Sequence, residues 1–364
     1  KSISSQAESI FIHAGNRSDT IRLLSGSAVV ETQAGRDNVS VQGGSNHTVS
    51  TGDNDDQASI STGSNSIYMG SGNDTVAVTG GSNMIYLQSG DDVVTVSSGT
   101  NIIHGQEGAD QLTITGGDNS ITSGSDGDTI QISEGINHIA TDAGEDTITL
   151  SGGTNTLNAG DDDDTITMTG GVNHISAGDG DDDVTASGGS ANIDIRTLDG
   201  GLGNDTLMSG AGDDQVFGGD GDDLIIQNGS GNQSYDGGAG NDTLEVDTSF
   251  VTNLNENYPN SISINLETGD MGQTDNPNLR DTIIDIENIT FKGDYNTKII
   301  GTGDSNIIIS DKGNDFINGK GGDDNINSGD GDDIIVRGEQ GIATIDGGSG
   351  NDTLKVTLNN LENY

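Results

Sequence analysis

Three consecutive nonapeptides decide how this chain folds: GGLGNDTLM at 200–208, SGAGDDQVF at 209–217 and GGDGDDLII at 218–226. They follow the pattern G-G-x-G-x-D-x-U-x, in which U is a large apolar residue. So short a period is typical of a solenoid, in which each repeat packs only against its neighbours. The sixth position is occupied by Asp205, Asp214 and Asp223, and the eighth by Leu207, Val216 and Ile225.

The residue types of the nonapeptide suit a turn followed by a short strand. Glycines allow left-handed backbone conformations, and the apolar eighth residue points inward from the strand. Two nonapeptides then make one coil, and stacking of coils at about 4.8 Å places their aspartates in a row. Two like charges about 4 Å apart repel by about 1 kcal/mol in water. Calcium relieves this repulsion, because it accepts carboxylate and carbonyl oxygens in a flexible shell.

The composition points to a fold that needs a counterion. The 364 residues include 59 Gly, 2 Pro, no Cys and no Trp, and 59 acidic residues against 12 Lys and Arg give a net charge of −47. Such a chain would normally be disordered, but its strict period argues for conditional folding. The charge argues against nucleic acid or an anionic membrane as a partner, and no apolar run is long enough to span a bilayer. A chain without Cys fits a secreted protein that relies on metal instead of disulfides.

Residues 53–187 form a longer array with a period of 18 residues and two unlike halves. One half carries an aspartate followed by two alternating apolar residues, as in Asp74, Val76 and Val78, which places both apolar residues on one face of a strand. The other half carries an asparagine. We therefore expect an Asp ladder of Asp56, Asp74, Asp92, Asp110, Asp128, Asp146, Asp164 and Asp182 along one edge, and an Asn ladder of Asn65, Asn83, Asn101, Asn119, Asn137, Asn155 and Asn173 along the other.

The Asp ladder is expected to bind calcium, and the Asn ladder to be mostly free of metal. A stacked asparagine is neutral and can bond its neighbours and its own turn. Between Asp37 and Ile195 there is no Lys or Arg but there are 25 acidic residues. No basic side chain of this segment can therefore neutralise the Asp ladder. The alternative interpretation is that the ladders only shape their turns.

The remaining segments are arranged around these arrays. The start of the chain repeats poorly, and a later block that holds both prolines breaks the repeat. We interpret that block as a connector whose aromatics cover solenoid ends; a ligand-binding insertion is the alternative. A degenerate unit has Asn232 in the aspartate position. The expected parts are a degenerate cap at 1–52, the 18-residue array at 53–187, nonapeptides at 188–245, the connector at 246–300, nonapeptides at 301–356 and the start of a further connector at 357–364.

No catalytic constellation stands out, and the chain is not expected to be an enzyme. The H-E-x-x-H, G-x-S-x-G and phosphate-loop motifs are absent. Carboxylates are so numerous that no pair is distinguished as acid and base. The histidines are expected to be exposed turn residues and not zinc ligands; they are His13, His47, His104, His138 and His174.

The nonapeptides at 200–245 and 310–354 closely resemble those of the RTX (repeats-in-toxin) family, and residues 53–187 resemble them more loosely. The resemblance implies an all-β fold, a right-handed parallel β-roll or β-helix solenoid with calcium ions in the turns. The ligands it implies are the sixth-position aspartate and main-chain carbonyls. Carried over by position, these aspartates are Asp205, Asp214, Asp223, Asp242, Asp315, Asp324, Asp333 and Asp352.

The resemblance also implies a function. Members of the family leave Gram-negative bacteria by type I secretion, unfolded in low cytosolic calcium, and fold outside the cell. We therefore expect an extracellular, calcium-folded segment of a secreted toxin or similar exoprotein, with calcium and the secretion apparatus as partners. An adhesin segment that binds a host-cell receptor or glycan, and the repeat module of a secreted enzyme, stay open as alternatives. Ice binding through a flat Thr/Asn array of turns is not expected, because the corresponding turn residues include Ser71, Glu107 and Asp161.

Overall fold

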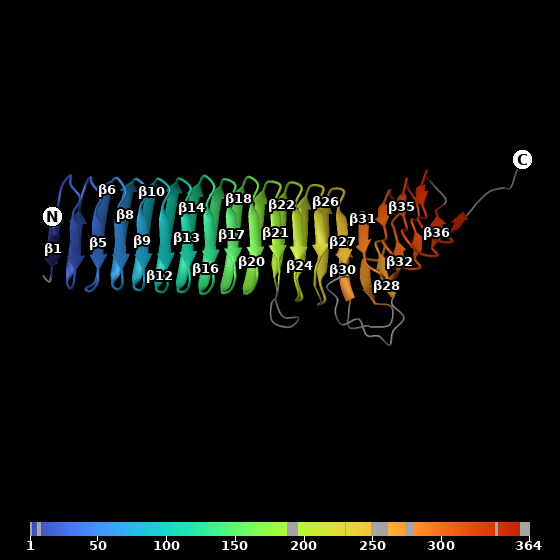
Figure 1. Cartoon of the computed structure of the whole chain (residues 1–364), viewed down its shortest axis with the longest axis horizontal. Coiled ribbons are helices and arrows are strands. Elements are labelled where there is room, and N and C mark those ends of the chain that lie inside the picture. The colour runs from blue at the N-terminus through green and yellow to red at the C-terminus, as the bar shows by residue number, and fades with distance from the viewer. Residues whose placement is uncertain are drawn as a thin grey trace, which may run out of the picture. The chain divides into compact units, whose positions relative to one another are not determined.

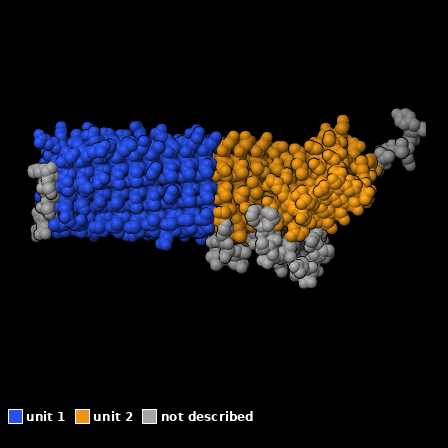
Figure 2. All heavy atoms as spheres, in the orientation of Figure 1, with its two compact units in different colours: residues 1–179 blue, residues 180–364 orange. Residues whose placement is uncertain are grey.

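The structure, a computed structural model, is an all-β parallel solenoid, as the repeats predict. It falls into two compact units, residues 1–179 (unit 1) and 180–364 (unit 2), which are coloured separately in Figure 2. The part that it describes contains no helix, and hence none long and apolar enough to cross a membrane. The described residues are 2–5, 9–187, 196–229, 231–248, 261–273, 280–338 and 341–356.

In unit 1 each coil gives one strand to each of two parallel sheets, so that the chain passes alternately between them (Figure 1). Sheet A consists of β1 (Ser2–Ser5), β3 (Thr20–Leu23), β5 (Asn38–Val41), β7 (Gln57–Ile60), β9 (Thr75–Val78), β11 (Val93–Val96), β13 (Gln111–Ile114), β15 (Thr129–Ile132), β17 (Thr147–Leu150) and β19 (Thr165–Met168). Sheet B consists of β2 (Ser9–His13), β4 (Ser27–Glu31), β6 (His47–Asp53), β8 (Ser64–Ser71), β10 (Ser82–Ser89), β12 (Thr100–Glu107), β14 (Asp118–Ser125), β16 (Ile136–Ala143), β18 (Thr154–Asp161) and β20 (Val172–Asp179).

The parallel register holds equivalent residues of successive coils in columns. Asn83 of β10 pairs with Asn65 of β8 on one side and with Asn101 of β12 on the other. Every second residue points inward. In one coil Ile67 of β8 and Val76 of β9 are fully buried between the sheets. Burying one such side chain contributes about 1.5–3 kcal/mol, and since a coil buries only a few, it depends on its neighbours.

Glycines in the turns let the coils stack this closely. Gly72 has a φ of 127° and Gly90 one of 123°, in the region that side chains rarely adopt. A Cβ on Gly72 would lie 2.5 Å from the main-chain carbonyl carbon of Asn54, and one on Gly90 would lie 2.1 Å from the carbonyl oxygen of Gly72. Both conformation and space therefore require glycine at these positions.

Unit 2 has the same two-sheet plan. Its sheet A consists of β21 (Asp183–Ala186), β23 (Thr206–Ser209), β25 (Leu224–Gln227), β27 (Thr243–Asp247), β31 (Asn288–Lys292), β33 (Ile307–Ile309), β35 (Asn325–Asn327) and β37 (Thr344–Asp346). Its sheet B consists of β22 (Thr197–Leu202), β24 (Gln215–Asp220), β26 (Ser234–Ala239), β28 (Ser261–Asn265), β29 (Asp270–Gln273), β30 (Arg280–Ile284), β32 (Asn296–Ile300), β34 (Phe316–Asn318), β36 (Ile334–Arg337) and β38 (Thr353–Val356).

The stretch at 246–300 contributes strands to both sheets of unit 2. In sheet A, β27 pairs directly with β31, and β31 with β33. In sheet B, β30 pairs with the antiparallel strand β29, which pairs with β28, and β28 then pairs with β32. Of the aromatics in this stretch, Phe291 is fully buried in the core. Phe250, Tyr258, Pro259 and Pro277 lie outside the described residues, as does the expected connector at 357–364.

Candidate metal sites along the turn edges

The aspartates of the Asp ladder end the turns that lead into sheet A, and each is buried. The main-chain N–H of one aspartate donates a hydrogen bond to Oδ1 of the aspartate in the next coil. Asp74 donates to Asp92 at 2.6 Å, and Asp92 donates to Asp110 at 2.8 Å. The backbone thereby fixes one oxygen of each carboxylate and leaves the other, Oδ2, inside the coil. The same bond links Asp19 to Asp37, Asp37 to Asp56, Asp56 to Asp74, Asp110 to Asp128, Asp128 to Asp146, and Asp146 to Asp164.

Seven Oδ2 atoms are the unusual feature of this edge, because each is buried without a hydrogen-bond partner among the described residues. Burial raises the pKa of Asp74 to about 7 and that of Asp110 to about 8. An ionised carboxylate in such surroundings is costly unless something compensates its charge. Each coil therefore needs a cation or a proton at this point. In unit 1 these atoms belong to Asp37, Asp56, Asp74, Asp92, Asp110, Asp128 and Asp146.

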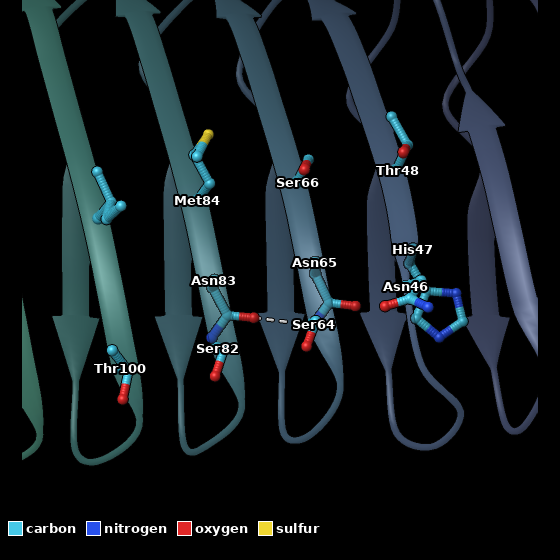
Figure 3. A pocket seen from close by; sticks show the side chains of 11 residues that line it. Asn46, His47, Thr48, Ser64, Asn65, Ser66, Ser82, Asn83, Met84 and Thr100 are labelled. Atoms are coloured by element: carbon cyan, nitrogen blue, oxygen red, sulfur yellow. Dashed lines mark hydrogen bonds between the residues drawn. The ribbon is translucent and has the colours of Figure 1, made fainter.

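The Asn ladder on the opposite edge satisfies its own hydrogen bonds. Nδ2 of Asn65 donates to Oδ1 of Asn83 at 2.8 Å (Figure 3) and to the carbonyl oxygen of Thr62 at 2.9 Å. The same two bonds recur along the ladder as far as Asn155, which donates to Asn173 at 2.7 Å and to Gly152 at 3.0 Å. Both amide hydrogens are used, and a buried neutral amide with its partners needs no cation. The two edges therefore differ in chemistry.

The prediction that the histidines are exposed is wrong for His47, whose side chain is buried. The register pairs His47 with Asn65, so His47 occupies the Asn-ladder position of its coil (Figure 3). Its Nε2 lies 3.0 Å from the carbonyl oxygen of Gly43. Within the described part of the chain, neither its Nδ1 nor Oδ1 of Asn65 has a partner. His47 lies 18 residues before Asn65, and this spacing would have placed it on the ladder, whereas a search for asparagine alone misses it. His13, His138 and His174 are exposed, and His104 is half-buried.

Unit 2 shows the Asp-ladder geometry on the edge that leads into its sheet A. Asp205 donates to Asp223 at 2.8 Å, and Asp223 donates to Asp242 at 2.9 Å. The Oδ2 atoms of these three aspartates are again buried without a partner among the described residues. Asp242 in turn donates to Oε2 of Glu287 at 2.8 Å, so a glutamate takes the next ladder position. Asp182 donates to Asp205 at 2.8 Å, and Asn306 to Asp324 at 3.1 Å.

The edge that leads into sheet B of unit 2 begins with an internal cation. The main-chain N–H of Arg196 donates to Oδ1 of Asp214 at 3.2 Å. In the other coils the main-chain N–H of a ladder aspartate makes this bond, so Arg196 occupies a ladder position. Nη1 of Arg196 lies 3.6 Å from Oδ2 of the same carboxylate, and both side chains are fully buried. Burial raises the pKa of Asp214, and the charge of Arg196 opposes that shift. The protein itself therefore supplies a positive charge at this ladder position.

The next coil on this edge uses amide groups. Gln215 pairs with Ser234, so Gln233 lies in line with Asp214, and the assignment of Asn232 to that position is wrong by one residue. The main-chain N–H of Gln233 donates to Oδ1 of Asp281 at 2.8 Å, and Nε2 of Gln227 donates to Oδ2 of Asp281 at 2.8 Å. Both oxygens of Asp281 thus have protein donors.

The remaining predicted aspartates lie further along the same edge. Asp315 donates to Asp333 at 2.8 Å, and Asp333 donates to Asp352 at 3.1 Å. Asp352 is exposed. The structure therefore brings each sequence-predicted aspartate into a ladder. It also places in ladder positions four acidic residues that were not predicted as ligands: Asp19, Asp37, Asp281 and Glu287.

The donor set at these positions suits calcium. No group of three or more His, Asp or Glu side chains that could hold a metal occurs among the described residues. A metal on these edges must therefore draw mainly on main-chain oxygens beside a single carboxylate. Calcium accepts such a mixture of oxygens, whereas magnesium requires stricter geometry and zinc prefers nitrogen and sulfur. The buried, unpartnered Oδ2 atoms thus fit calcium.

The chain was compared with known proteins and with protein-family models. A similar solved structure is described as a hyperactive, Ca²⁺-dependent, β-helical antifreeze protein from an Antarctic bacterium; it shares 18% identity with a TM-score of 0.33, over 92% of this chain and 86% of that chain. No curated protein matches the chain. A family model described as the RTX calcium-binding nonapeptide repeat (4 copies) matches residues 68–103, 95–130, 132–166, 197–226, 227–246, 300–335 and 337–355.

Proposed function

The chain belongs to the family of RTX calcium-binding nonapeptide repeats, and on that premise we propose that it is the calcium-folded module of an exported protein. The observation that carries the proposal is the row of buried Oδ2 atoms, which recurs in coil after coil without a protein partner among the described residues. A module of this kind has no catalysis of its own. It supports export and extracellular folding of a parent toxin or similar exoprotein.

The ladders explain how calcium would control folding. A backbone N–H holds Oδ1 of each aspartate in place, so the carboxylates can gather in a row only when the coils are stacked. Calcium bound to that row adds free energy to the folded state alone. In a calcium-poor cytosol the carboxylates repel one another and the chain stays unfolded, a form that can pass through a type I exporter of a Gram-negative bacterium. Outside the cell, calcium favours the folded coils, which cannot slide back.

Folding should spread from one end, because each coil is stabilised by its neighbours. If the C-terminal end leaves the exporter first, we expect the array at 301–356 to be the nucleus and residues 1–52 to order last. Hydrogen exchange at rising calcium should show protection first near Asp315–Asp352 and afterwards in residues 53–187. Earlier protection in 53–187 would rule out this direction of folding, while calcium-driven folding itself would stand.

A second candidate function, glycan binding by an adhesin, is favoured by an aromatic stack on the outer face of sheet B in unit 1. The rings of Tyr68 and Tyr86 stack at 5.0 Å between centroids, and Tyr86 stacks on His104 at the same distance. The stack ends there, because the next residue in the column is Thr122. A groove of about 440 Å³ follows, lined by Tyr86, His104, Thr122 and Asp142 among others. Ring surface beside a few polar groups is typical of a small-molecule site.

If this groove binds a glycan, His104→Ala should weaken binding by about tenfold, equivalent to about 1.4 kcal/mol. The variant removes the ring that ends the stack, while the strand pairing of β12 is retained. His138→Ala is the matched control, since His138 is exposed on the same face but does not line the groove. Binding to a glycan panel in millimolar calcium measures the effect. Equal binding by both variants, or no glycan bound by the wild type, would remove this candidate.

A further inference from the structure

The residue five positions before each ladder aspartate, called here the gate residue, separates the coils into two kinds. Gly105 is the gate residue of Asp110, and Gly200 and Gly218 are those of Asp205 and Asp223. None of these three glycines has a positive φ. Glycine in a strand costs about 0.5–1 kcal/mol relative to alanine. Because no positive φ requires glycine at these positions, the reason for glycine is that a side chain would not fit.

The space beside the unit 2 gate glycines is bounded by two oxygens. A Cβ on Gly200 would lie 2.1 Å from Oδ2 of Asp205 and 2.5 Å from the carbonyl oxygen of Gly218 in the next coil. On Gly218 it would lie 2.2 Å from Oδ2 of Asp223 and 2.4 Å from the carbonyl oxygen of Gly237. A buried carboxylate oxygen and a carbonyl oxygen therefore lie together against the α carbon of the glycine, an arrangement called here the cradle, and any side chain on the glycine would collide with them.

Unit 1 has the same cradle at Gly105. A Cβ there would lie 2.3 Å from Oδ2 of Asp110 and 2.1 Å from the carbonyl oxygen of Ser123. Asp110 is 1% exposed, and its Oδ2 has no hydrogen-bond partner among the described residues. The match is notable because this coil lacks the leading Gly-Gly pair of the nonapeptides: His104 precedes Gly105.

At the other positions of the Asp ladder of unit 1 the gate residue has a side chain. Met69 and Leu87, the gate residues of Asp74 and Asp92, are fully buried. The hydroxyl of Thr51 donates to the carbonyl oxygen of Met69 at 2.6 Å, and that of Thr141 donates to Ala159 at 2.5 Å. These two carbonyl oxygens occupy the position that the carbonyl oxygen of Ser123 has at the Gly105 cradle. The gate residues from Asp19 to Asp164 are Ala14, Thr32, Thr51, Met69, Leu87, Gly105, Ser123, Thr141 and Ala159.

Ser310, the gate residue of Asp315 in unit 2, shows what a hydroxyl does at this point. Its hydroxyl lies within hydrogen-bond distance of both Oδ2 of Asp315 and the carbonyl oxygen of Ser328, the latter at 3.1 Å, and its one proton bridges these two acceptors. These two atoms correspond to Oδ2 of Asp110 and the carbonyl oxygen of Ser123 at the cradle beside Gly105. A serine hydroxyl therefore takes the place, and the contacts, that a cation would have.

We propose that the gate residue decides which ladder aspartates hold calcium, and that the cradle of Gly105, Asp110 and Ser123 is the calcium site of the Asp ladder in unit 1. The other coils of that ladder are closed by a methyl, hydroxyl or larger side chain. This inference deepens the proposed function and rests on it. It narrows the expected row of calcium ions in residues 53–187 to one position. In unit 2 it predicts calcium at the ladder aspartates whose gate residue is glycine.

Matched substitutions in the full chain test the gate. Asp110→Asn and Asp92→Asn keep the size of the side chain, and we expect the first to lose one calcium ion per chain and the second none. Gly105→Ser should also lose one ion, because its hydroxyl would close the cradle as Ser310 does. Leu87→Gly should gain one ion by opening the cradle beside Asp92. Equilibrium dialysis against radioactive calcium counts the ions, and circular dichroism confirms that each variant folds.

The possible results distinguish failure of the gate-residue proposal from failure of the proposed function. Equal loss of calcium from Asp110→Asn and Asp92→Asn would overturn the gate and indicate a uniform row of ions. Full calcium retention by Asp110→Asn would also overturn it. Both results leave calcium-dependent folding intact. A wild-type chain that binds no calcium would instead remove the proposed function, together with the gate. If Gly105→Ser does not fold, the two Asp→Asn variants still decide the question.

Discussion

Removal of calcium should unfold the described coils almost completely, and this is the largest effect we expect. The chain has a net charge of −47, and its ladder aspartates hold buried oxygens that have no partner among the described residues. A charge buried without compensation costs several kcal/mol after relaxation, and coils that hold no calcium depend on stacking against the neighbours that do. Circular dichroism in excess chelator should lose the strand signal. It should recover cooperatively with calcium on the order of 10⁻⁴–10⁻³ M, as for extracellular modules.

Two controls distinguish binding at the ladders from general screening. Magnesium at the same concentration should restore less structure, because it requires stricter geometry and keeps its waters. Sodium chloride at about 1 M shortens the Debye length to about 3 Å, which weakens repulsion between exposed charges but supplies no ligand to a buried oxygen. Full refolding in sodium chloride alone, or a strand-rich spectrum that chelator does not change, would contradict the calcium requirement.

Arg196→Met should produce the second largest effect. The substitution keeps a long apolar side chain but leaves Asp214 buried without its cation, and Asp214 is fully buried. Breaking a buried ion pair in this way costs about 3–5 kcal/mol. The measurement is hydrogen exchange of the amides in β22 and β24, in saturating calcium, because the local free energy of opening is defined there even if the whole chain does not unfold in one step.

The double variant Arg196→Met/Asp214→Asn should recover much of the loss, since it removes the stranded charge. Arg36→Met is the matched control: Arg36 pairs with Asp55 at the surface, and its side chain is 74% exposed. Exposed pairs contribute about 0–1 kcal/mol. If Arg196→Met costs no more than Arg36→Met, the buried guanidinium is not the cation that holds this edge together.

The period of the sequence was sufficient to predict the coils and their register. The 18-residue spacing of Asn65, Asn83 and Asn101 is the spacing at which neighbouring strands of sheet B pair. The alternation of Val76 and Val78 predicted which face is buried. Such predictions succeed because a solenoid repeats one local contact, so equal spacing in sequence becomes vertical stacking in space. The aspartates of the ladders followed from the same spacing.

What the period does not encode had to come from the tertiary structure. Glu287 follows Asp242 on the ladder although 45 residues separate them, because β31 pairs directly with β27. The chain between these two strands forms β28 and β29, which lie in sheet B on the far side of β30. Asp281 reaches its position on the other edge through the same insertion. Pairing across an inserted segment is decided by the free energy of the whole sheet and not by spacing along the chain.

The sequence by itself thus determined the all-β solenoid, the two chemically different edges of residues 53–187 and the aspartates that line up along them. Only the tertiary structure decided what each aspartate meets. Whether Oδ2 of Asp110 faces a cradle, Asp214 a guanidinium or Asp315 a hydroxyl depends on atoms of neighbouring coils within a few ångströms. Residue types at fixed spacing specify which positions stack, whereas the volume left between stacked positions appears only when the side chains of adjacent coils are packed together.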